Sequence, residues 1–227
     1  MKLAPNSVNV ALELLAERRY GDFARRCLGL IHDQRVFYAL ARDLEIPLVA
    51  PQAKIPIRVR EMQPSDVPAL FDGDPAMMSR KERIEMQTRR AHLDARIPTC
   101  YVAEDERNGA PCYFQWLMGP QQNDKIQAFF PPGCFPVLKH DEALLENAYT
   151  PVAYRGNGIM SAAMALIAER AAELGCRFVT TYVERDNVAS LKGCKRSGFM
   201  PFQERVESRY LFNLVHRRRF RALTASA

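Results

Sequence analysis

The sequence predicts an α/β protein in which strands alternate with helices, and three observations indicate this class. Residues 143–175 have the pattern of a strand, a glycine-containing turn and a helix. A second strand pattern follows at 177–184, and a second helical pattern at 188–197. Further upstream, the segments 99–105 and 111–118 have the composition and alternation of strands. We therefore expect a sheet covered by helices.

Length and composition indicate an ordinary soluble protein. The chain has 227 residues, of which 48% are hydrophobic and 26% charged, enough to bury a substantial core. Its apolar runs are shorter than the roughly 18 residues that a membrane span requires, and the N-terminus lacks a signal-peptide pattern. Six scattered cysteines without a CxxC pair indicate reduced thiols and a cytoplasmic location. The four histidines show no metal-ligand spacing, so no metal is expected.

The net charge of +6 and the isoelectric point near 9.1 permit binding to a polyanion but do not demonstrate it. The most basic stretch, residues 216–219 with Arg221, lacks the interleaved aromatic residues of a single-strand nucleic-acid platform. We interpret it as the solvated end of the chain and expect no nucleic-acid partner.

The first 50 residues are predicted to form a helical extension that precedes the domain. Residues 7–19, 20–32 and 34–44 show helical spacing and are rich in Leu, Ala and Arg. We expect this extension to pack on the domain or on a partner subunit. Residues 47–56 contain three prolines and are predicted to be an extended linker, which ends at about residue 55.

The domain itself is predicted to span residues 55–220, with a tail at 221–227. A strand at 55–62 precedes a short helix that has Ser65 or Asp66 near its start. Ser79 and Glu82 have the spacing of a capping box, which predicts a second helix reaching about Ala95.

Two strands, a long insertion and two final strands complete the domain. Asn108 and Gly109 predict a tight turn between the strands at 99–105 and 111–118. The segment 119–141 is too long for a hairpin loop and is rich in Phe and Pro. We expect it either to line a substrate pocket or to cover a dimer surface. The last strands are predicted at 203–208 and 210–215.

The turn at residues 155–158 is the most informative stretch of the chain. Gly156 and Gly158 permit positive φ angles and a close approach of a ligand to the backbone. The helix that follows starts at Ile159 and is predicted to stop at Gly175. Since the first turn of a helix carries unpaired N–H groups and the positive end of the dipole, this turn can hold phosphate oxygens.

These residues resemble the signature of the GNAT superfamily of acyl-CoA-dependent N-acyltransferases. That signature has Arg or Gln, two residues, Gly, one residue, then Gly or Ala; here these are Arg155, Gly158 and Met160, so the last position departs from it. The family's next motif has Asn, Ser three residues later and a helix ending in Gly-Phe. Asn187, Ser190 and residues 198–199 match it in the expected order.

The resemblance implies a mixed, mostly antiparallel α/β (α+β) sheet with helices on both faces, here preceded by the helical extension. It also implies that the turn binds the pyrophosphate of acetyl-CoA, or of another acyl-CoA, as co-substrate. Backbone groups near Tyr149 and Thr150 would bind the pantetheine arm, and the Asn187 amide would either bond pantetheine or cap its own helix. The expected cofactor-binding residues are Tyr149, Thr150, Arg155, Gly156, Asn157, Gly158, Ile159, Met160, Asn187 and Ser190.

The catalytic groups are expected on the strand before the turn and on the second helix. Some family members use a glutamate on that strand as the base, which suggests Glu146, with Glu142 in reserve. Strand alternation would place Glu146 on the face of Leu144 and Ala148, where an apolar setting raises a carboxyl pKa. The family's usual acid is a tyrosine at the position that Cys194 occupies here. Either the Cys194 thiol is the acid, or it is a packing residue and water or a tyrosine replaces it; the candidate tyrosines are Tyr154, Tyr182 and Tyr210.

The function implied is N-acetyltransferase activity, with direct attack of a small-molecule primary amine on acetyl-CoA. Two alternatives stay open at this point. One is transfer of a longer acyl group from CoA or an acyl carrier protein; the other is a non-catalytic member that binds acyl-CoA or a protein partner. A homodimer is also left open.

Overall fold

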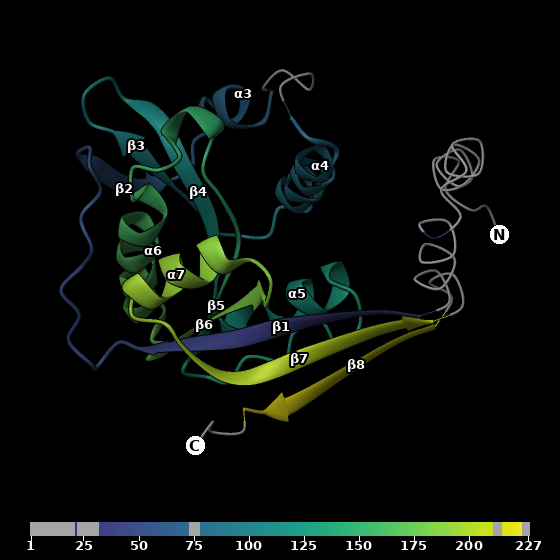
Figure 1. Ribbon diagram of the computed structural model, residues 1–227. Coiled ribbons are helices and arrows are strands. Elements are labelled where there is room, and N and C mark those ends of the chain that lie inside the picture. The colour runs from purple at the N-terminus through teal and green to yellow at the C-terminus, as the bar shows by residue number, and fades with distance from the viewer. Residues whose placement is uncertain (1–20, 22–31, 73–77, 211–214, 224–227) are drawn as a thin grey trace.

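The fold is built on one eight-stranded sheet with the strand order β2-β3-β4-β5-β6-β1-β7-β8 (Figure 1). The computed structural model describes residues 21, 32–72, 78–210 and 215–223. All neighbouring strands are antiparallel except β5 and β6, so the predicted mixed, mostly antiparallel sheet is confirmed. The strands are β1 (His32–Asp43), β2 (Ile57–Glu61), β3 (Cys100–Asp105), β4 (Ala110–Met118), β5 (Glu142–Tyr149), β6 (Phe178–Glu184), β7 (Met200–Tyr210) and β8 (Val215–Ala222).

Helices cover both faces of this sheet, as predicted. The α-helices are α3 (Asp66–Phe71), α4 (Arg80–Asp94), α5 (Asn123–Phe129), α6 (Ile159–Glu169) and α7 (Val188–Arg196). Short 3₁₀ turns lie at η2 (Pro120–Gln122), η3 (Val152–Tyr154) and η4 (Arg170–Leu174). The capping box of Ser79 and Glu82 starts α4, and Gly175 ends the α6–η4 segment in the left-handed conformation, both as the sequence predicted.

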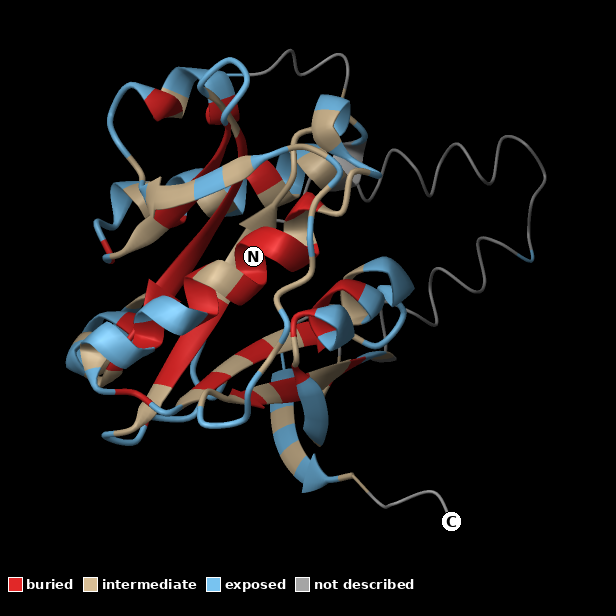
Figure 2. Cartoon of the chain, turned by 90° about the vertical axis from the view of Figure 1, so that its left-hand side faces the viewer, coloured by how far each residue is buried: buried red, intermediate tan, exposed pale blue. Residues whose placement is uncertain are grey.

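Two hydrophobic clusters lie on opposite faces of the sheet. The first, which we call the α6 cluster, includes Ile159, Met164 and Ile167 of α6 together with Phe199. The second, which we call the Trp116 cluster, joins Trp116 to buried residues of α3, α4 and α5. Figure 2 shows buried residues along the central strands, whereas much of the outer surface of the covering helices is exposed.

The predicted helix over 34–44 is wrong, because residues 34–43 lie in β1, hydrogen-bonded between β6 and β7. A central strand is covered on both faces, so its apolar residues do not alternate cleanly with polar ones. Val36, Ala39 and Leu40 are all buried, and their spacing imitates a helix. The sheet therefore includes residues N-terminal to the predicted domain boundary at 55. The helices predicted over 7–19 and 20–32 fall almost wholly outside the described residues.

The end of the chain also differs from the prediction. The strand expected at 210–215 is β8, which starts at Val215 and runs to Ala222, so the basic stretch is an edge strand and part of the predicted tail belongs to the sheet. Ion pairs to β7 hold it there: Arg218 Nε lies 3.1 Å from Glu207 Oε1, and Arg221 Nη2 lies 2.7 Å from Glu204 Oε2. The arginines of β8 neutralise glutamates on the paired strand. They do not alternate with apolar residues, so the pattern that usually predicts a strand is missing here.

The insertion at 119–141 packs against the Trp116 cluster. It contains η2 and α5, and Ile126 and Phe135 are buried there. Asn123 closes the segment, since its amide nitrogen donates to Leu138 O and its Oδ1 accepts from Leu138 N, both at 2.9 Å. The insertion is thus part of the core on that face.

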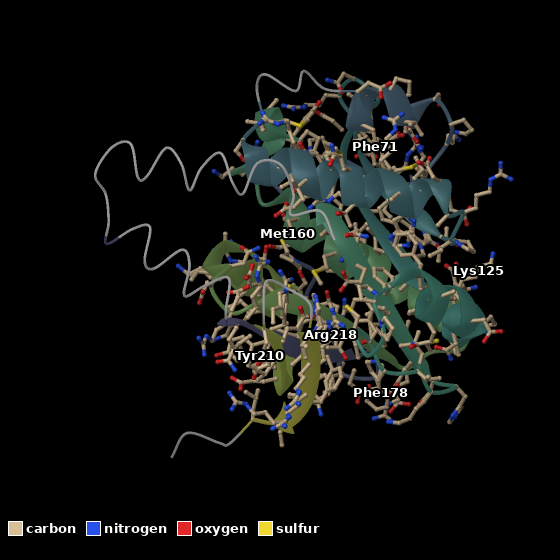
Figure 3. The ribbon with its side chains drawn as sticks, turned by 90° about the vertical axis from the view of Figure 1, so that its right-hand side faces the viewer. Phe71, Lys125, Met160, Phe178, Tyr210 and Arg218 are labelled. Carbon is tan, nitrogen blue, oxygen red and sulfur yellow. The ribbon has the colours of Figure 1, made fainter. Side chains whose placement is uncertain are left out.

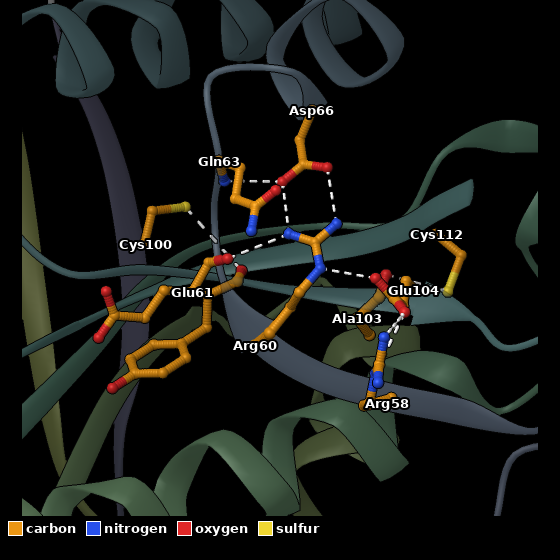
Figure 4. A network of polar contacts seen from close by, with 10 residues as sticks. Arg58, Arg60, Glu61, Gln63, Asp66, Cys100, Ala103, Glu104 and Cys112 are labelled. Carbon is orange, nitrogen blue, oxygen red and sulfur yellow. Dashed lines mark hydrogen bonds and ion pairs between the residues drawn. The ribbon is translucent and has the colours of Figure 1, made fainter. Parts of the chain in front are cut away.

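A network of arginines and carboxylates attaches α3 to the edge of the sheet (Figure 4). Arg60 of β2 donates to both carboxylate oxygens of Asp66, at 2.7 and 2.8 Å, and its Nε reaches Glu104 of β3 at 2.6 Å. The backbone N–H of Gln63 also donates to Asp66. Bidentate arginine–carboxylate pairs of this kind are strong and directional.

We expect Asp66→Asn to lower the free energy of unfolding by about 1.5–3 kcal/mol, because it breaks charge-assisted hydrogen bonds to a buried side chain. Asp72→Asn is the matched control: Asp72 pairs with Arg90 at 2.7 Å, but about half of each side chain is exposed. That change should cost less than about 1 kcal/mol. Urea unfolding of both variants measures the difference, and equal losses would contradict this account of the network.

Candidate active site

The site lies where β5 and β6 separate. These parallel strands pair only from Glu142↔Phe178 to Leu144↔Thr180. Beyond that point β5 continues to Tyr149 and β6 to Glu184, without further register pairs between them. The two strands therefore form a wedge inside a continuous sheet, and the last residues of β5 have β4 as their partner on one side only.

A β-bulge at Asn147 changes which faces of the sheet the last side chains of β5 occupy. On the β4 side Trp116 pairs with Glu146 and Phe114 with Tyr149, so β5 carries one extra residue. Asn147 adopts the left-handed conformation, with φ of 59°. After the bulge, Ala148 packs against the α6 cluster and Tyr149 against the Trp116 cluster. The predicted placement of Ala148 on the face of Leu144 is therefore wrong, because an extra residue reverses the alternation.

A cavity of about 860 Å³ occupies the wedge and extends between α4, α6 and α7. It lies in the region where Figure 3 labels Met160. Asn157 is the exception among the expected cofactor-binding residues, since its amide turns away to donate to Tyr154 O at 3.1 Å. The expected residues that line the cavity are Tyr149, Thr150, Arg155, Gly156, Gly158, Ile159, Met160, Asn187 and Ser190.

The glycine turn places the start of α6 at this cavity. Gly156 and Gly158 have φ of 79° and 73°, which a side chain would strain, and Gly158 is the N-cap of α6. The turn is attached to the preceding linker, because Lys54 N donates to Asn157 O at 2.8 Å. Since the first-turn N–H groups of an α-helix lack intrahelical partners and carry the positive end of the dipole, the arrangement suits an anion.

Charged groups of both signs surround the turn. Arg155 Nη1 lies 2.8 Å from Glu82 Oε1, and Arg155 Nε donates to Thr150 O at 3.1 Å. Hydrogen bonds from Ser79 and then from Arg155 lower the pKa of Glu82 to about 2, so it stays ionised. Because Glu82 also closes the capping box of α4, this ion pair joins the start of α4 to the turn before α6.

Asn187 is the N-cap of α7. Its Oδ1 accepts from Ser190 N at 3.2 Å, and both residues line the cavity. Of the two roles considered for Asn187, the cap is therefore present in the structure.

Met160, which departs from the family signature, fits against a glycine of the next helix. A Cβ added to Gly193 of α7 would lie 2.9 Å from Met160 Sδ. The long side chain thus occupies space that Gly193 leaves free, and both residues line the cavity. This complementarity explains how a bulky residue is accommodated at the start of α6.

Glu146 lies beside the bulge, on the face of the Trp116 cluster, and it is not among the residues that line the cavity. Its Oε1 is buried without a hydrogen-bond partner among the described residues. Burial raises its pKa to about 7, although Arg205, Arg89 and the backbone N–H groups of Asn147 and Tyr182 act in the opposite direction. A carboxyl group with that pKa can accept a proton near neutral pH. Glu142, the reserve candidate, instead pairs with Lys139 Nζ at 2.9 Å.

Of the two roles left open for Cys194, the structure favours packing over that of a catalytic acid. Its side chain is only 1% exposed, its Sγ lies 3.8 Å from Met164 Sδ in the α6 cluster, and it does not line the cavity. Burial raises the pKa of the thiol to about 12. Cys194 is therefore a packing residue. Of the three candidate tyrosines, Tyr154 lines the cavity, whereas Tyr182 lies in the Trp116 cluster and Tyr210 ends β7.

Three residues at the site were not predicted from the sequence: Arg89, His92 and Asn147. Arg89 of α4 lines the cavity and donates to Ala148 O at 3.2 Å, and His92 Nδ1 lies 2.7 Å from Asn147 Nδ2. One signal was available for Asn147, because asparagine tolerates the left-handed conformation better than most residues. The two α4 residues look like ordinary members of an amphipathic helix, and only the packing of α4 beside β5 reveals their role.

We expect Gly193→Ala and Met160→Ala to show coupled effects on stability. Alanine in a helix is favoured over glycine by roughly 0.5–1 kcal/mol, but in the wild-type background the new methyl group meets Met160 Sδ. In the Met160→Ala background that contact is absent, so Gly193→Ala should then be stabilising. A double-mutant cycle by urea unfolding should give a coupling of about 0.5 kcal/mol or more; additive effects would contradict the contact.

Comparisons with known proteins agree with this geometry. Residues 57–200 match the family model of the acetyltransferase (GNAT) domain, which is more than half of the chain. The comparison with curated proteins finds no match. In the described residues, no helix has the length and apolarity needed to cross a membrane.

Solved structures share the fold at low sequence identity. A glucosamine N-acetyltransferase region of a fungal multi-domain GH3 β-N-acetylglucosaminidase matches with a TM-score of 0.55 and 15% identity, over 84% of this chain and 22% of that one. A GCN5-related N-acetyltransferase from Sphaerobacter thermophilus matches with a TM-score of 0.50 and 16% identity, over 83% of this chain and 56% of that one. A functionally unknown conserved protein from Staphylococcus epidermidis matches with a TM-score of 0.51 and 9% identity, over 81% of this chain and 64% of that one. The chain thus spans less than two thirds of the length of these structures. By its match over residues 57–200, the chain belongs to the GNAT family of acetyltransferases.

Proposed function

We propose that this protein transfers an acetyl group from acetyl-CoA to a primary amine of a small molecule. The observation that carries the proposal is the wedge between β5 and β6. There, one cavity meets the glycine turn of α6 on one side and the bulge beside Glu146 on the other. Family membership supports acyl transfer in general, and the donor and the acceptor are our inference.

The residues suit the binding of an acyl-CoA. Gly156, Gly158 and the first turn of α6 would hold the pyrophosphate, with Arg155 beside it. The backbone near Tyr149 and Thr150 would bind the pantetheine arm and orient the thioester in the wedge. The net charge of +6 would attract so acidic a ligand.

Two proton transfers accompany the reaction, one to a base and one from an acid. The amine nitrogen attacks the thioester carbonyl carbon, a C–N bond forms, and collapse of the tetrahedral intermediate breaks the C–S bond. Glu146, with its pKa of about 7, accepts the proton that the amine loses through a bridging water, since it does not itself line the cavity. Tyr154, the candidate tyrosine that lines the cavity, or water returns a proton to the CoA thiolate. Attack is direct, without a covalent enzyme intermediate.

Release of free CoA thiol across a panel of primary amines tests this proposal. Mass spectrometry of the products must show one acetyl group added to the amine, and omission of the amine must reduce thiol release to the rate of hydrolysis. Release with long-chain acyl-CoA but not with acetyl-CoA would favour the longer-chain alternative. Binding of acetyl-CoA without transfer to any amine would overturn the assignment as an enzyme.

Gly158→Ala should weaken acetyl-CoA binding by tenfold or more, because a side chain at positive φ distorts the turn that starts α6. The left-handed conformation costs a non-glycine residue roughly 1–2 kcal/mol. Gly109→Ala is the matched control: its φ is 72° against 73°, and it lies in the turn between β3 and β4.

Both glycine variants should therefore lose similar stability, and only Gly158→Ala should lose affinity in titration calorimetry. Equal affinities would contradict the assignment of the phosphate turn. A loss of affinity in both variants would show that reduced stability, rather than the turn, is responsible.

Glu146→Gln should lower kcat by roughly 10²-fold or more, since it removes the general base. In the wild type, kcat/KM should rise with pH through about 7 as the carboxylate forms, and this ionisation should disappear in the variant. Glu142→Gln, on the same strand but paired with Lys139, should keep the wild-type profile. An unchanged profile in Glu146→Gln would transfer the role of base to another group.

The same pKa predicts an effect on stability with a definite sign. The folded state holds the Glu146 proton up to about pH 7, whereas the ordinary value is 4.5, so the free energy of unfolding falls as pH rises across this range. In Glu146→Gln the side chain does not titrate, so this decrease in the free energy of unfolding is absent. Its melting temperature relative to the wild type should therefore be higher at pH 8 than at pH 4, as measured by calorimetry.

A further inference from the structure

Two residues of α4 contact consecutive residues of the β5 bulge. Arg89 Nη2 donates to the carbonyl oxygen of Ala148 at 3.2 Å. His92 Nδ1 and the side-chain amide nitrogen of Asn147 lie 2.7 Å apart. Residues three apart lie on one face of a helix, so α4 presents both side chains to the same short stretch of strand.

This stretch of β5 needs support from outside the sheet. The ladder to β6 ends at Leu144, and the ladder to β4 skips Asn147 at the bulge. Asn147 is also held at φ of 59°, a sparsely populated conformation even though asparagine tolerates it better than most residues. Such a conformation persists only where surrounding contacts hold it in place.

His92 is fixed in one position and one charge state. It is fully buried, and its ring stacks on Trp116 and Phe129 with centroids 4.3 and 5.0 Å away. Burial lowers its pKa to about 4, so the ring is neutral at pH 7. An amide nitrogen is a donor only, so Nδ1 accepts from Asn147 and the ring proton is on Nε2. The ring is therefore a rigid acceptor for the bulge residue.

Arg89 holds the next two residues. Its guanidinium carbon lies 5.0 Å from the ring centroid of Tyr149, and only 11% of the side chain is exposed. An ion pair with Glu85, at 3.3 Å along the helix, helps to orient it. Arg89, Ala148 and Tyr149 all line the cavity, so the contact lies at the site itself.

We propose that Arg89 and His92 are positioning residues, which hold residues 147–149 of the bulge so that the cavity-lining backbone and the Glu146 carboxylate keep a fixed relation during acyl transfer. The catalytic part of this inference rests on the proposed function. The holding of the bulge itself does not, and it can be measured on the free protein.

Four variants test the two contacts. His92→Phe keeps an aromatic ring to stack on Trp116 but cannot accept from Asn147, and Asn147→Gly keeps the positive φ but lacks the amide. Arg89→Met removes the donor to Ala148, and Arg89→Lys retains a charged donor. The matched control is Arg90→Met, on the same helix, since Arg90 is half exposed and pairs with Asp72 instead.

The expected result is a loss of rate that exceeds the loss of donor binding. A displaced reacting group costs up to about 10²-fold, so kcat should fall by roughly 10–10²-fold in His92→Phe, Asn147→Gly and Arg89→Met. Calorimetric affinity for CoA should fall less than kcat, because Gly156, Gly158 and the first turn of α6 are unchanged and only the backbone near Tyr149, which would face pantetheine, is displaced. Arg89→Lys should recover part of kcat, and Arg90→Met should match the wild type.

Hydrogen–deuterium exchange of the free protein gives the second readout. Peptides covering residues 145–150 should exchange faster in the three damaging variants, while peptides from β3 and α7 should not change. The double variant His92→Phe/Asn147→Gly should be no worse than either single variant, since both remove one contact.

Wild-type kcat and wild-type exchange in Arg89→Met and Asn147→Gly would overturn the proposal. Slower catalysis with unchanged exchange at 145–150 would also overturn it, because the residues would then act by another route. If the wild-type protein transfers no acyl group to any amine, the proposed function fails, and the exchange experiment alone decides whether α4 holds the bulge. If His92→Phe does not fold, Asn147→Gly tests the same contact between His92 and Asn147.

Discussion

The separation of β5 from β6 after Leu144 is the constraint on which the rest of the site depends. A parallel ladder that continued to Tyr149 would fill the wedge with backbone hydrogen bonds and leave no room for a ligand. Because the ladder stops, the polar backbone groups at the end of β5 must find other partners. The bulge at Asn147, the contacts from α4 and the cavity all lie at this one interruption.

The α4 helix connects the parts of the site that the sheet keeps apart. Its first turn is joined to the glycine turn through Glu82 and Arg155, and its middle contacts the bulge through Arg89 and His92. The neighbouring helix α3 is in turn attached to the sheet edge by Arg60. The single helix α4 therefore links the phosphate turn to β5, the strand that would supply the catalytic base.

The bulge also separates two chemical environments along one strand. Before it, Glu146 faces aromatic surroundings that raise its pKa to about 7. After it, Ala148 and Tyr149 line a cavity that contains arginines and carboxylates. Buried polar atoms without partners, such as Glu146 Oε1 and His92 Nε2 among the described residues, are costly to leave in a protein interior. Their presence beside the bulge is consistent with a site that exchanges some stability for function.

The sequence by itself determined the local features whose signals lie within a few residues. These are the glycine turn with its positive φ angles, the cap at Ser79, the stop at Gly175 and, apart from η2 and α5 in the insertion, the order of the strands and helices from residue 57 to about 200. Together with the family motifs, they were sufficient for the fold class and for the part of the cavity formed by the end of β5, the glycine turn and the start of α7. Each depends on backbone conformation or on a hydrogen bond to a near neighbour in the chain.

Only the tertiary structure decided the features that depend on distant partners. Val36 and Leu40 belong to a central strand rather than a helix because β6 and β7 flank them. Cys194 is a packing residue because α6 covers it, and Ala148 changes faces because Asn147 adds a residue against β4. Arg89 and His92 contact β5 although more than fifty residues separate them from it. Spacing along the chain carries no record of such contacts, since they arise only when the sheet and its covering helices have packed together.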